Sequence, residues 1–167
     1  MSREDSTKHL GLIADSKLNF REHISAQIVK AKKGLALMKH LAKWVSAFVL
    51  ELTYKMFVRP FLDFGDLIFH NQKTDMMDKL ESIQYQAALI VSNCWYGTSQ
   101  ARLYEELGWE SLAERRTFRR LAHYYKILSK KTPPYLKEHI KPLPQNSTNR
   151  YLNSIFPLLP EFMGNSQ

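Results

Sequence analysis

The sequence predicts a mainly α-helical bundle with one short N-terminal strand and a proline-rich, irregular C-terminal tail. Three observations support this fold class. Apolar residues recur every three or four positions over most of residues 19–131, as on the buried face of a helix. All prolines except Pro60 follow Lys131, where they disfavour regular structure. A hydrophobic content of 44% with 12% aromatic residues is typical of a folded chain.

The first predicted element is a strand over residues 9–15, which are mostly apolar and end in a polar turn. We find no hairpin partner for it nearby. A strand without a partner leaves its backbone groups unpaired. We therefore expect its partner to come from a protein segment upstream of this sequence.

Two helices are predicted between Asn19 and Pro60. Asn19 and Glu22 resemble an N-terminal capping box for the first helix. Ser46 caps the second helix, which ends at Pro60 because proline clashes with the preceding turn. The apolar spacing is carried by Ile24, Ile28, Ala31, Leu35, Met38, Ala42 and Val45 in the first helix, and by Ala47, Leu50, Tyr54, Phe57 and Val58 in the second. The first helix also carries Lys30, Lys32, Lys33, Lys39 and Lys43, with no acid between Glu22 and Glu51.

A packed connector or short extended piece is expected from Phe61 to His70, and a third helix begins at Thr74 or Asp75. Its apolar stripe comprises Met77, Leu80, Ile83, Ala87 and Ile90. A loop follows over residues 92–97, and then a short helix over residues 99–107.

The clearest local signals surround the next helix. Gly108 is a C-terminal cap, since glycine tolerates the left-handed conformation. Ser111 and Glu114 form a capping box. The helix that follows has an apolar face with Leu112, Phe118, Leu121, Ala122, Tyr125 and Leu128, and a cationic face with Arg116, Arg119, Arg120, Lys126 and Lys130. This cationic face is either a solvated surface or a binding site for phosphates.

The net charge of +8 and a pI near 9.6 favour a polyanionic partner. Nucleic acid, an acidic protein and an anionic membrane surface all remain open. The single cysteine, Cys94, excludes an internal disulfide and a cysteine-based zinc site, and we expect it to be a buried core residue. No signal peptide or membrane-spanning stretch is found, so we expect an intracellular protein of the cytoplasm or nucleus.

No catalytic or metal-binding constellation emerges from the sequence. Phosphate-binding glycine loops are absent, and the histidines lack metal-ligand spacing. The carboxylates are not clustered as two-metal chemistry requires. Asp63 and Asp66, the spaced aspartates in an apolar context, are assigned capping or turn roles.

The chain resembles the segment that follows the catalytic palm in reverse transcriptases of non-LTR (LINE-type) retrotransposons, especially jockey-like, CR1-like and RTE-like elements. The matching blocks are Leu-Gly-Leu-Ile-Ala-Asp-Ser-Lys-Leu-Asn-Phe at residues 10–20, Tyr-Lys-Met-Phe-Val-Arg-Pro at 54–60, Leu-Glu-Ser-Ile-Gln at 80–84, and Leu-Gly-Trp-Glu-Ser-Leu-Ala-Glu-Arg-Arg at 107–116, continuing to Tyr-Lys-Ile-Leu at 125–128. Pro-Pro-Tyr-Leu at 133–136 and Phe-Pro at 156–157 are also similar to that family. The order and spacing of the blocks make the combination specific.

The resemblance implies a thumb-like helical region that holds a template–primer duplex, catalytically incomplete on its own. It implies that residues 1–18 are a remnant of the strand at the end of the palm, with Leu10 and Gly11 near the primer grip. Residues 19–131 would form the thumb-like region, and residues 132–167 a C-terminal extension packed on it. The family's catalytic Asp pair, on an upstream hairpin, has no counterpart here. The chain should therefore hold no cofactor, although the parent polymerase would use Mg²⁺, and its partners would include the missing palm domain.

The expected ligand is RNA or an RNA–DNA duplex, bound through phosphates without reading bases. The candidate contacts are Lys30, Lys32, Lys33, Lys39, Arg116, Arg119, Arg120 and Lys126. No contact is placed on the helix that contains Tyr85, where the family often has arginines.

The alternative is a helical protein-interaction module without a nucleic-acid role, with a derelict transposon fragment as its close relative. A membrane-surface helix at residues 112–130 is not favoured, because packing against neighbouring helices would consume its apolar stripe, and we expect no membrane partner. Cations that share one concave face would favour duplex binding, and cations on opposite faces would favour a merely solvated surface. Exposed tryptophans at Trp44 or Trp109 would favour the module.

Overall fold

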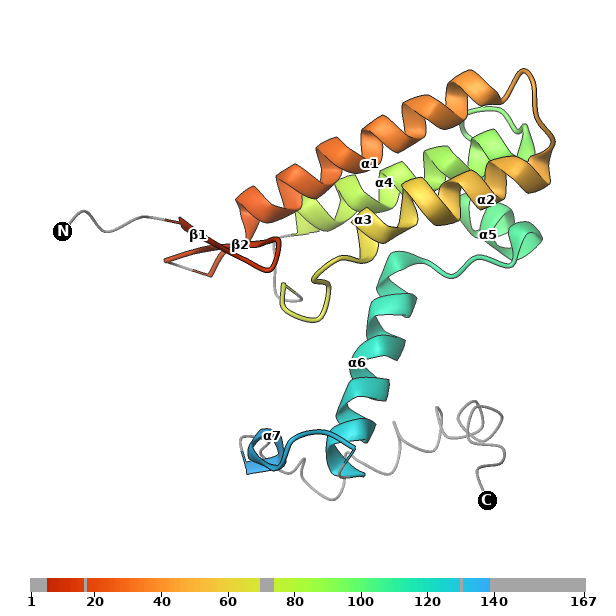
Figure 1. Cartoon of the computed structure of the whole chain (residues 1–167). Helices are drawn as coiled ribbons and strands as arrows, with labels where there is room; N and C mark the ends of the chain where they lie inside the picture. Colours follow the sequence, from red (N-terminus) through yellow and green to blue (C-terminus); the bar gives the residue numbers. More distant parts are fainter. Residues whose placement is uncertain (1–5, 17, 70–73, 130, 139–167) are drawn as a thin grey trace. The chain divides into compact units, whose positions relative to one another are not determined.

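The fold is mainly helical, as the sequence predicts, with a small antiparallel sheet near the N-terminus (Figure 1). The computed structural model describes residues 6–16, 18–69, 74–129 and 131–138. The elements are β1 (Ser6–His9), β2 (Leu12–Asp15), α1 (Arg21–Leu41), α2 (Ala47–Phe57), α3 (Arg59–Asp63), α4 (Thr74–Ser92), α5 (Gln100–Leu107), α6 (Leu112–Leu128) and α7 (Pro134–Glu138). The chain divides into two compact units, Met1–Ala122 and His123–Gln167, and α6 crosses from the first to the second.

The predicted lone strand is half of a β-hairpin. β1 and β2 pair antiparallel, with His9 opposite Leu12. Leu10 and Gly11 connect them with φ angles of 48° and 88°, the positive values that a tight type I′ hairpin turn requires. The prediction of a strand without a nearby partner is wrong, and with it the need for an upstream one. The turn is hard to find in the sequence because leucine rarely adopts a positive φ.

The start of α1 also differs from the prediction. The N-cap position belongs to Phe20, whose φ is 48°, and Asn19 forms no capping box with Glu22. Instead, the Asp15 carboxylate at the end of β2 accepts hydrogen bonds from the backbone N–H groups of Asn19, at 2.6 Å, and Phe20, at 3.2 Å. The hairpin is thereby tied to the helix. α1 ends at Leu41, short of the predicted Val45.

Pro60 separates two helices rather than ending one. α2 begins after Ser46, as predicted, and ends at Phe57, and Pro60 lies in the first turn of α3. Proline fits there because the first N–H groups of a helix need no intrahelical partner. Residues 61–63, expected to belong to a connector, are therefore helical. The predicted boundaries of α4 and α5 agree closely with the structure.

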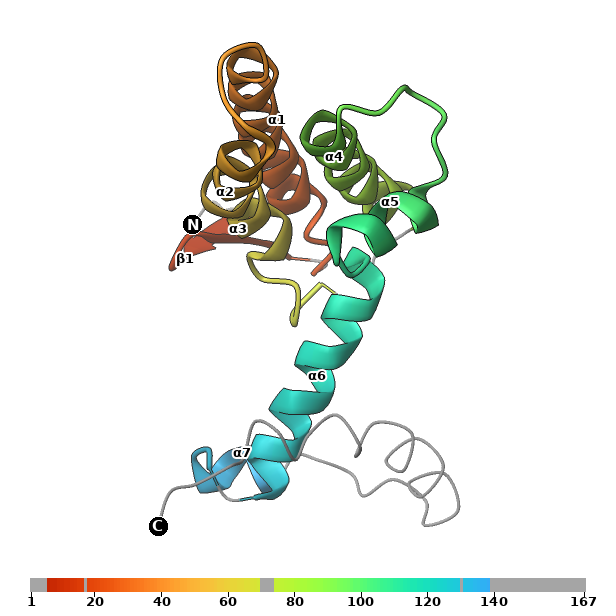
Figure 2. The ribbon, with the colours of Figure 1, turned by 90° about the vertical axis from the view of Figure 1, so that its right-hand side faces the viewer.

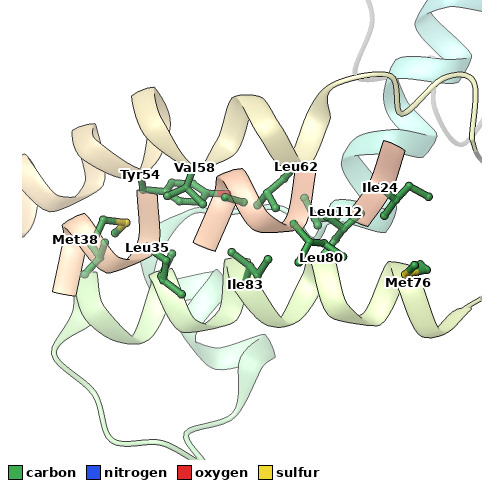
Figure 3. Close-up of a cluster of buried hydrophobic side chains, with 14 of the residues drawn as sticks. Ile24, Leu35, Met38, Tyr54, Val58, Leu62, Met76, Leu80, Ile83 and Leu112 are labelled. Carbon is green, nitrogen blue, oxygen red and sulfur yellow. The ribbon is translucent and has the colours of Figure 1, made fainter. Parts of the chain in front are cut away.

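The hydrophobic core lies between α1, α2, α3 and α4. In Figure 1, α1, α2 and α4 run side by side, and Figure 2 shows them nearly end-on. Figure 3 shows their buried side chains meeting in one cluster. The core includes Ile24, Leu35, Met38, Leu50, Tyr54, Val58, Leu62, Met76, Leu80, Ile83 and Leu112. Gly34 permits the close approach of α1 and α2, because a Cβ there would lie 2.3 Å from the backbone oxygen of Phe57.

The Leu-Glu-Ser-Ile-Gln block in α4 connects three helices through polar side chains. Glu81 accepts hydrogen bonds from the Tyr104 hydroxyl in α5, at 2.8 Å, and from the Leu112 N–H at the start of α6, at 2.9 Å. Gln84, which is fully buried, accepts from the Tyr54 hydroxyl at 2.8 Å and donates to the Glu110 carbonyl at 2.8 Å. These contacts fix where α6 begins.

Residues 132–167 were expected to be irregular and to pack on the helices. Within the described part, residues 134–138 form α7, so the beginning of this region is helical. The prolines and apolar residues of positions 139–167, and Lys130, lie outside the described residues. No helix among those described combines the length and apolar character needed to cross a membrane.

Candidate nucleic-acid interface

The cations predicted to bind phosphates fall into two groups, the exposed lysines of α1 and the cations of α6, most of which contact the protein itself. Lys30, Lys32, Lys33 and Lys39 are all exposed. Within the described ranges, none of them forms an ion pair with a carboxylate. α1 has one acidic residue, Glu22 in its first turn, so its surface is strongly cationic beyond that point.

The α1 lysines occupy two flanks of the helix rather than one. Lys30 and Lys33 border an apolar groove with Phe57 and Phe61, on the side of α2 and α3. The Lys30 Nζ lies 5.9 Å from the centre of the Phe61 ring. Lys39 borders a separate pocket on the side of α4. Lys32 precedes Lys39 by seven residues, about two helical turns, and so shares its flank.

On α6, Arg119 and Arg115 are anchored to the aspartates that follow α2. Arg119 donates to Asp66 at 2.7 Å and also pairs with Asp63. Arg115 donates to Asp63 at 2.9 Å and to the buried Gln84 at 3.1 Å. Asp63 and Asp66 were assigned capping or turn roles from the sequence, whereas the structure makes them ion-pair acceptors. The burial of Asp66 raises the pKa of its carboxyl group even beside Arg119.

Arg116 is also turned inward and is only 7% exposed. Its guanidinium donates to the Met77 sulfur at 3.0 Å and to the Leu62 carbonyl at 3.5 Å, and lies 5.9 Å from the centre of the Phe69 ring. Burial lowers the pKa of this guanidinium. Its Nε is buried without a hydrogen-bond partner among the described groups. The side chain is therefore part of the packed interior.

The remaining predicted cations of α6 differ from these. Arg120 is half-buried along its own helix, where it donates to the Arg116 carbonyl at 3.4 Å and to the Thr117 hydroxyl at 3.1 Å. Lys126 is exposed and belongs to the second unit. The predicted apolar face of α6 is buried at Leu112, but Phe118 and Leu128 are exposed.

The residues assigned to a primer grip lie at the tip of the β-hairpin. Leu10 is 89% exposed. Gly11 packs near Phe64, since a Cβ on it would lie 3.4 Å from the Phe64 Cζ. Their backbone conformation is that of a turn, as described above.

Sequence reasoning missed Arg115 and Arg59, both of which contact Asp63. They line a polar pocket of about 330 Å³ together with Glu51 and Trp109. The spacing is compatible with these contacts, because Arg115 and Arg119 lie one helical turn apart and Asp63 and Asp66 three residues apart, but it does not indicate that α6 packs against α3. Of the two tryptophans considered for partner binding, Trp44 is exposed, whereas Trp109 stacks on Tyr54 with ring centres 4.1 Å apart.

Among the described residues, no three histidine, cysteine or acidic side chains are grouped so that they could hold a metal ion. Cys94 is half-buried rather than fully buried, and it packs against a small core cluster between α4 and α5. Comparisons with protein families, with curated proteins and with solved structures find no match for this chain.

Proposed function

We propose that this chain is a thumb-like C-terminal part of a non-LTR retrotransposon RNA-directed DNA polymerase, and that it binds the template–primer backbone without completing an active site. The observation that supports binding is the set of exposed lysines on α1 that form no ion pair with any described residue. A lysine that forms no ion pair in the protein can neutralise a phosphate without first losing a partner. Phosphate contacts of this kind carry no sequence information, so binding is tolerant of sequence.

The arginines of α6 take a different part in this proposal. Binding a phosphate through Arg116 or Arg119 would require breaking internal contacts, and a buried charge that loses its partner costs several kcal/mol. We therefore assign phosphate binding in the first unit to the four α1 lysines and half-exposed Arg120, and the attachment of α6 to α3 to Arg115 and Arg119. Exposed Lys126 remains a candidate in the second unit.

The polymerase family to which the proposal refers uses Mg²⁺, but the described residues do not fit that ion. No three histidine, cysteine or acidic side chains are grouped among them, and the neighbouring carboxylates of Asp63 and Asp66 are occupied by Arg119. Two-metal phosphoryl transfer needs such a group to hold both ions. The proposal consequently contains no catalytic step for this chain.

Filter binding with a labelled RNA–DNA duplex at low salt tests the proposal. We expect measurable affinity for the unmodified chain and a large loss in the variant that combines Lys30→Gln, Lys32→Gln, Lys33→Gln and Lys39→Gln. Lys79→Gln is the control, because Lys79 lies on α4 and pairs with Asp75. No affinity at low salt would contradict nucleic-acid binding altogether.

The second candidate, a helical protein-interaction module, is favoured by the outer face of α2. Phe48, Leu52 and Met56 follow one another at four-residue spacing and are all exposed, with Phe48 at 74%. Surface helices normally present polar residues on such a face, and exposed apolar patches commonly mark interaction sites. A Leu52→Glu variant that keeps its affinity for the duplex would show that this face does not serve nucleic-acid binding.

A further inference from the structure

A rigid turn between α4 and α5 presents two aromatic side chains to solvent. Trp95 is 90% exposed and Tyr96 is 87% exposed. Large aromatic side chains are usually at least half-buried in folded proteins, because exposing them forfeits hydrophobic stabilisation. Two consecutive ones in this state therefore need an explanation.

The turn is held in place by hydrogen bonds to its backbone. The Thr98 N–H donates to the Trp95 carbonyl at 3.2 Å, and the Thr98 hydroxyl donates to the same oxygen at 2.8 Å. Tyr85 of α4 donates from its hydroxyl to the Thr98 carbonyl at 2.8 Å and accepts from the Gly97 N–H at 3.2 Å. Gly97 has a φ of 100°, which favours glycine. The aromatic side chains thus start from a preorganised backbone, which lowers the entropic cost of binding.

A pocket of about 400 Å³ lies beside the turn, between the ends of α1 and α4. The residues of its lining that carry polar groups are Lys39, Gln86, Asn93, Cys94 and Tyr96. Leu89 and Ile90 contribute apolar surface, and none of the residues that line it is acidic. The pocket therefore combines a cation, hydrogen-bonding amides and an aromatic ring.

We propose that this aromatic turn and its pocket bind an unpaired base of single-stranded nucleic acid. Trp95 and Tyr96 provide faces on which bases stack, and Lys39 binds an adjacent phosphate. The amides of Gln86 and Asn93 can both donate to and accept from the edge of a base. A cation without an acidic neighbour in a chain of net charge +8 suits an anionic polymer. The inference rests on the proposed nucleic-acid binding and adds a base-dependent contact to it, on a helix where the sequence indicated none.

The test compares two single-stranded oligonucleotides of about ten nucleotides, a length within the usual range of single-strand binding sites. One carries bases, and the other has the same phosphates but abasic sugars. We expect the unmodified chain to prefer the oligonucleotide with bases. Trp95→Ala and Tyr96→Ala should each weaken its binding by roughly 5- to 140-fold, since stacking of one base on an aromatic ring has that effect. Binding of the abasic oligonucleotide should change little.

Trp44→Ala is the matched control, because Trp44 is 79% exposed but lies between α1 and α2 rather than on the turn between α4 and α5. It should keep the preference for bases. Equal binding of the two oligonucleotides by the unmodified chain would overturn the base contact while leaving phosphate binding intact. Equal effects of Trp95→Ala and Trp44→Ala would also overturn it, as would insertion of the turn into anionic vesicles without any preference for bases. Absence of binding to either oligonucleotide would overturn both proposals.

Discussion

Arg119 donates a hydrogen bond to the carboxylate of Asp66 at a distance of 2.7 Å, across 53 positions of sequence. With Arg115 and Asp63, this pair fastens the first turns of α6 to the end of α3. A helix surface that looks purely cationic in the sequence is thus partly an internal contact. Under the proposed function, phosphate binding therefore relies on other cations.

Replacing Asp63 by asparagine should strongly destabilise the first unit. Asp63 accepts from Arg115 and Arg119, and Arg115 is almost completely buried. Removing one partner of a buried ion pair leaves an uncompensated charge, at a cost of about 3–5 kcal/mol. Urea unfolding measures this cost. Asp75→Asn is the control, because Asp75 pairs with Arg21 and Lys79 at the surface. This substitution should lower the free energy of unfolding by only about 0–1 kcal/mol. Equal midpoints for the two variants would contradict the anchoring role.

Stability should fall on acidification because of His23. This side chain is fully buried, its Nδ1 accepts from the Ile13 N–H at 3.4 Å, and its Nε2 donates to the Phe64 carbonyl at 3.4 Å. Burial lowers the pKa of the imidazole, with a smaller contribution from Lys30. Protonation of Nδ1 would also remove the acceptor of the Ile13 N–H, because two N–H groups would then point at each other. The contribution of neutral His23 is therefore complete above its ordinary pKa and is lost as the pH falls through the lowered value.

Urea unfolding at several pH values between about 7.5 and 5 checks this expectation, across the ordinary pKa of histidine. His23→Gln should reduce the loss of stability on acidification. His40→Gln, at an exposed position of the same helix, should leave it unchanged. If His23→Gln retains the full pH dependence, the buried imidazole is not its source.

Loss of the Ser111 hydroxyl should destabilise the start of α6. Its oxygen accepts from the Glu114 N–H at 3.2 Å, and the Glu114 carboxylate accepts from the Ser111 N–H at 3.0 Å. Ser111→Ala should cost about 0.5–2 kcal/mol, the usual cost of losing an N-cap side chain. Ser99→Ala is the control, since Ser99 occupies the N-cap position of α5 without a capping hydrogen bond. Thermal unfolding that ranks Ser99→Ala as the more damaging change would refute the assignment.

Alanine at Gly34 should destabilise the bundle although alanine is the better helix former. Its Cβ would lie 2.3 Å from the Phe57 backbone oxygen, so α1 and α2 would have to separate. We expect a loss of about 1–3 kcal/mol in chemical denaturation, as for other overpacked cores. Ala36→Gly, at an exposed position of α1, measures helix propensity alone, about 1 kcal/mol. A Gly34→Ala variant more stable than the unmodified chain would show that the helices do not touch there.

Local sequence patterns predicted most helices of this fold. They did not predict which side chains pair across long sequence separations. Gly108 has the predicted left-handed conformation, with φ of 63°, and the Ser111 capping box forms as expected. These features depend on neighbouring residues. The pairing of Arg115 with Asp63 depends on how α6 approaches α3, which no local pattern specifies.

The candidate interface shows the same limit. The exposure of the α1 lysines follows from their helical spacing, because the apolar stripe fixes which side of α1 is buried. The same reasoning fails for Arg116. Its charge predicts solvent exposure, whereas the structure buries it in contact with Met77 and Leu62. The prediction of a strand that includes Leu10 was wrong for a related reason, because the positive φ of Leu10 is set by the pairing of β1 with β2 rather than by the preference of leucine.

The salt dependence of binding to an RNA–DNA duplex tests the central claim most directly. If the four α1 lysines neutralise four phosphates, they contribute about −3.6 to the slope of a plot of log K against log salt concentration. In the variant with Lys30, Lys32, Lys33 and Lys39 changed to glutamine, affinity should fall sharply and the slope should become shallower by about that amount, leaving only the contribution of Arg120 and Lys126. A variant that keeps the slope and affinity of the unmodified chain would contradict the assignment of phosphate binding to α1.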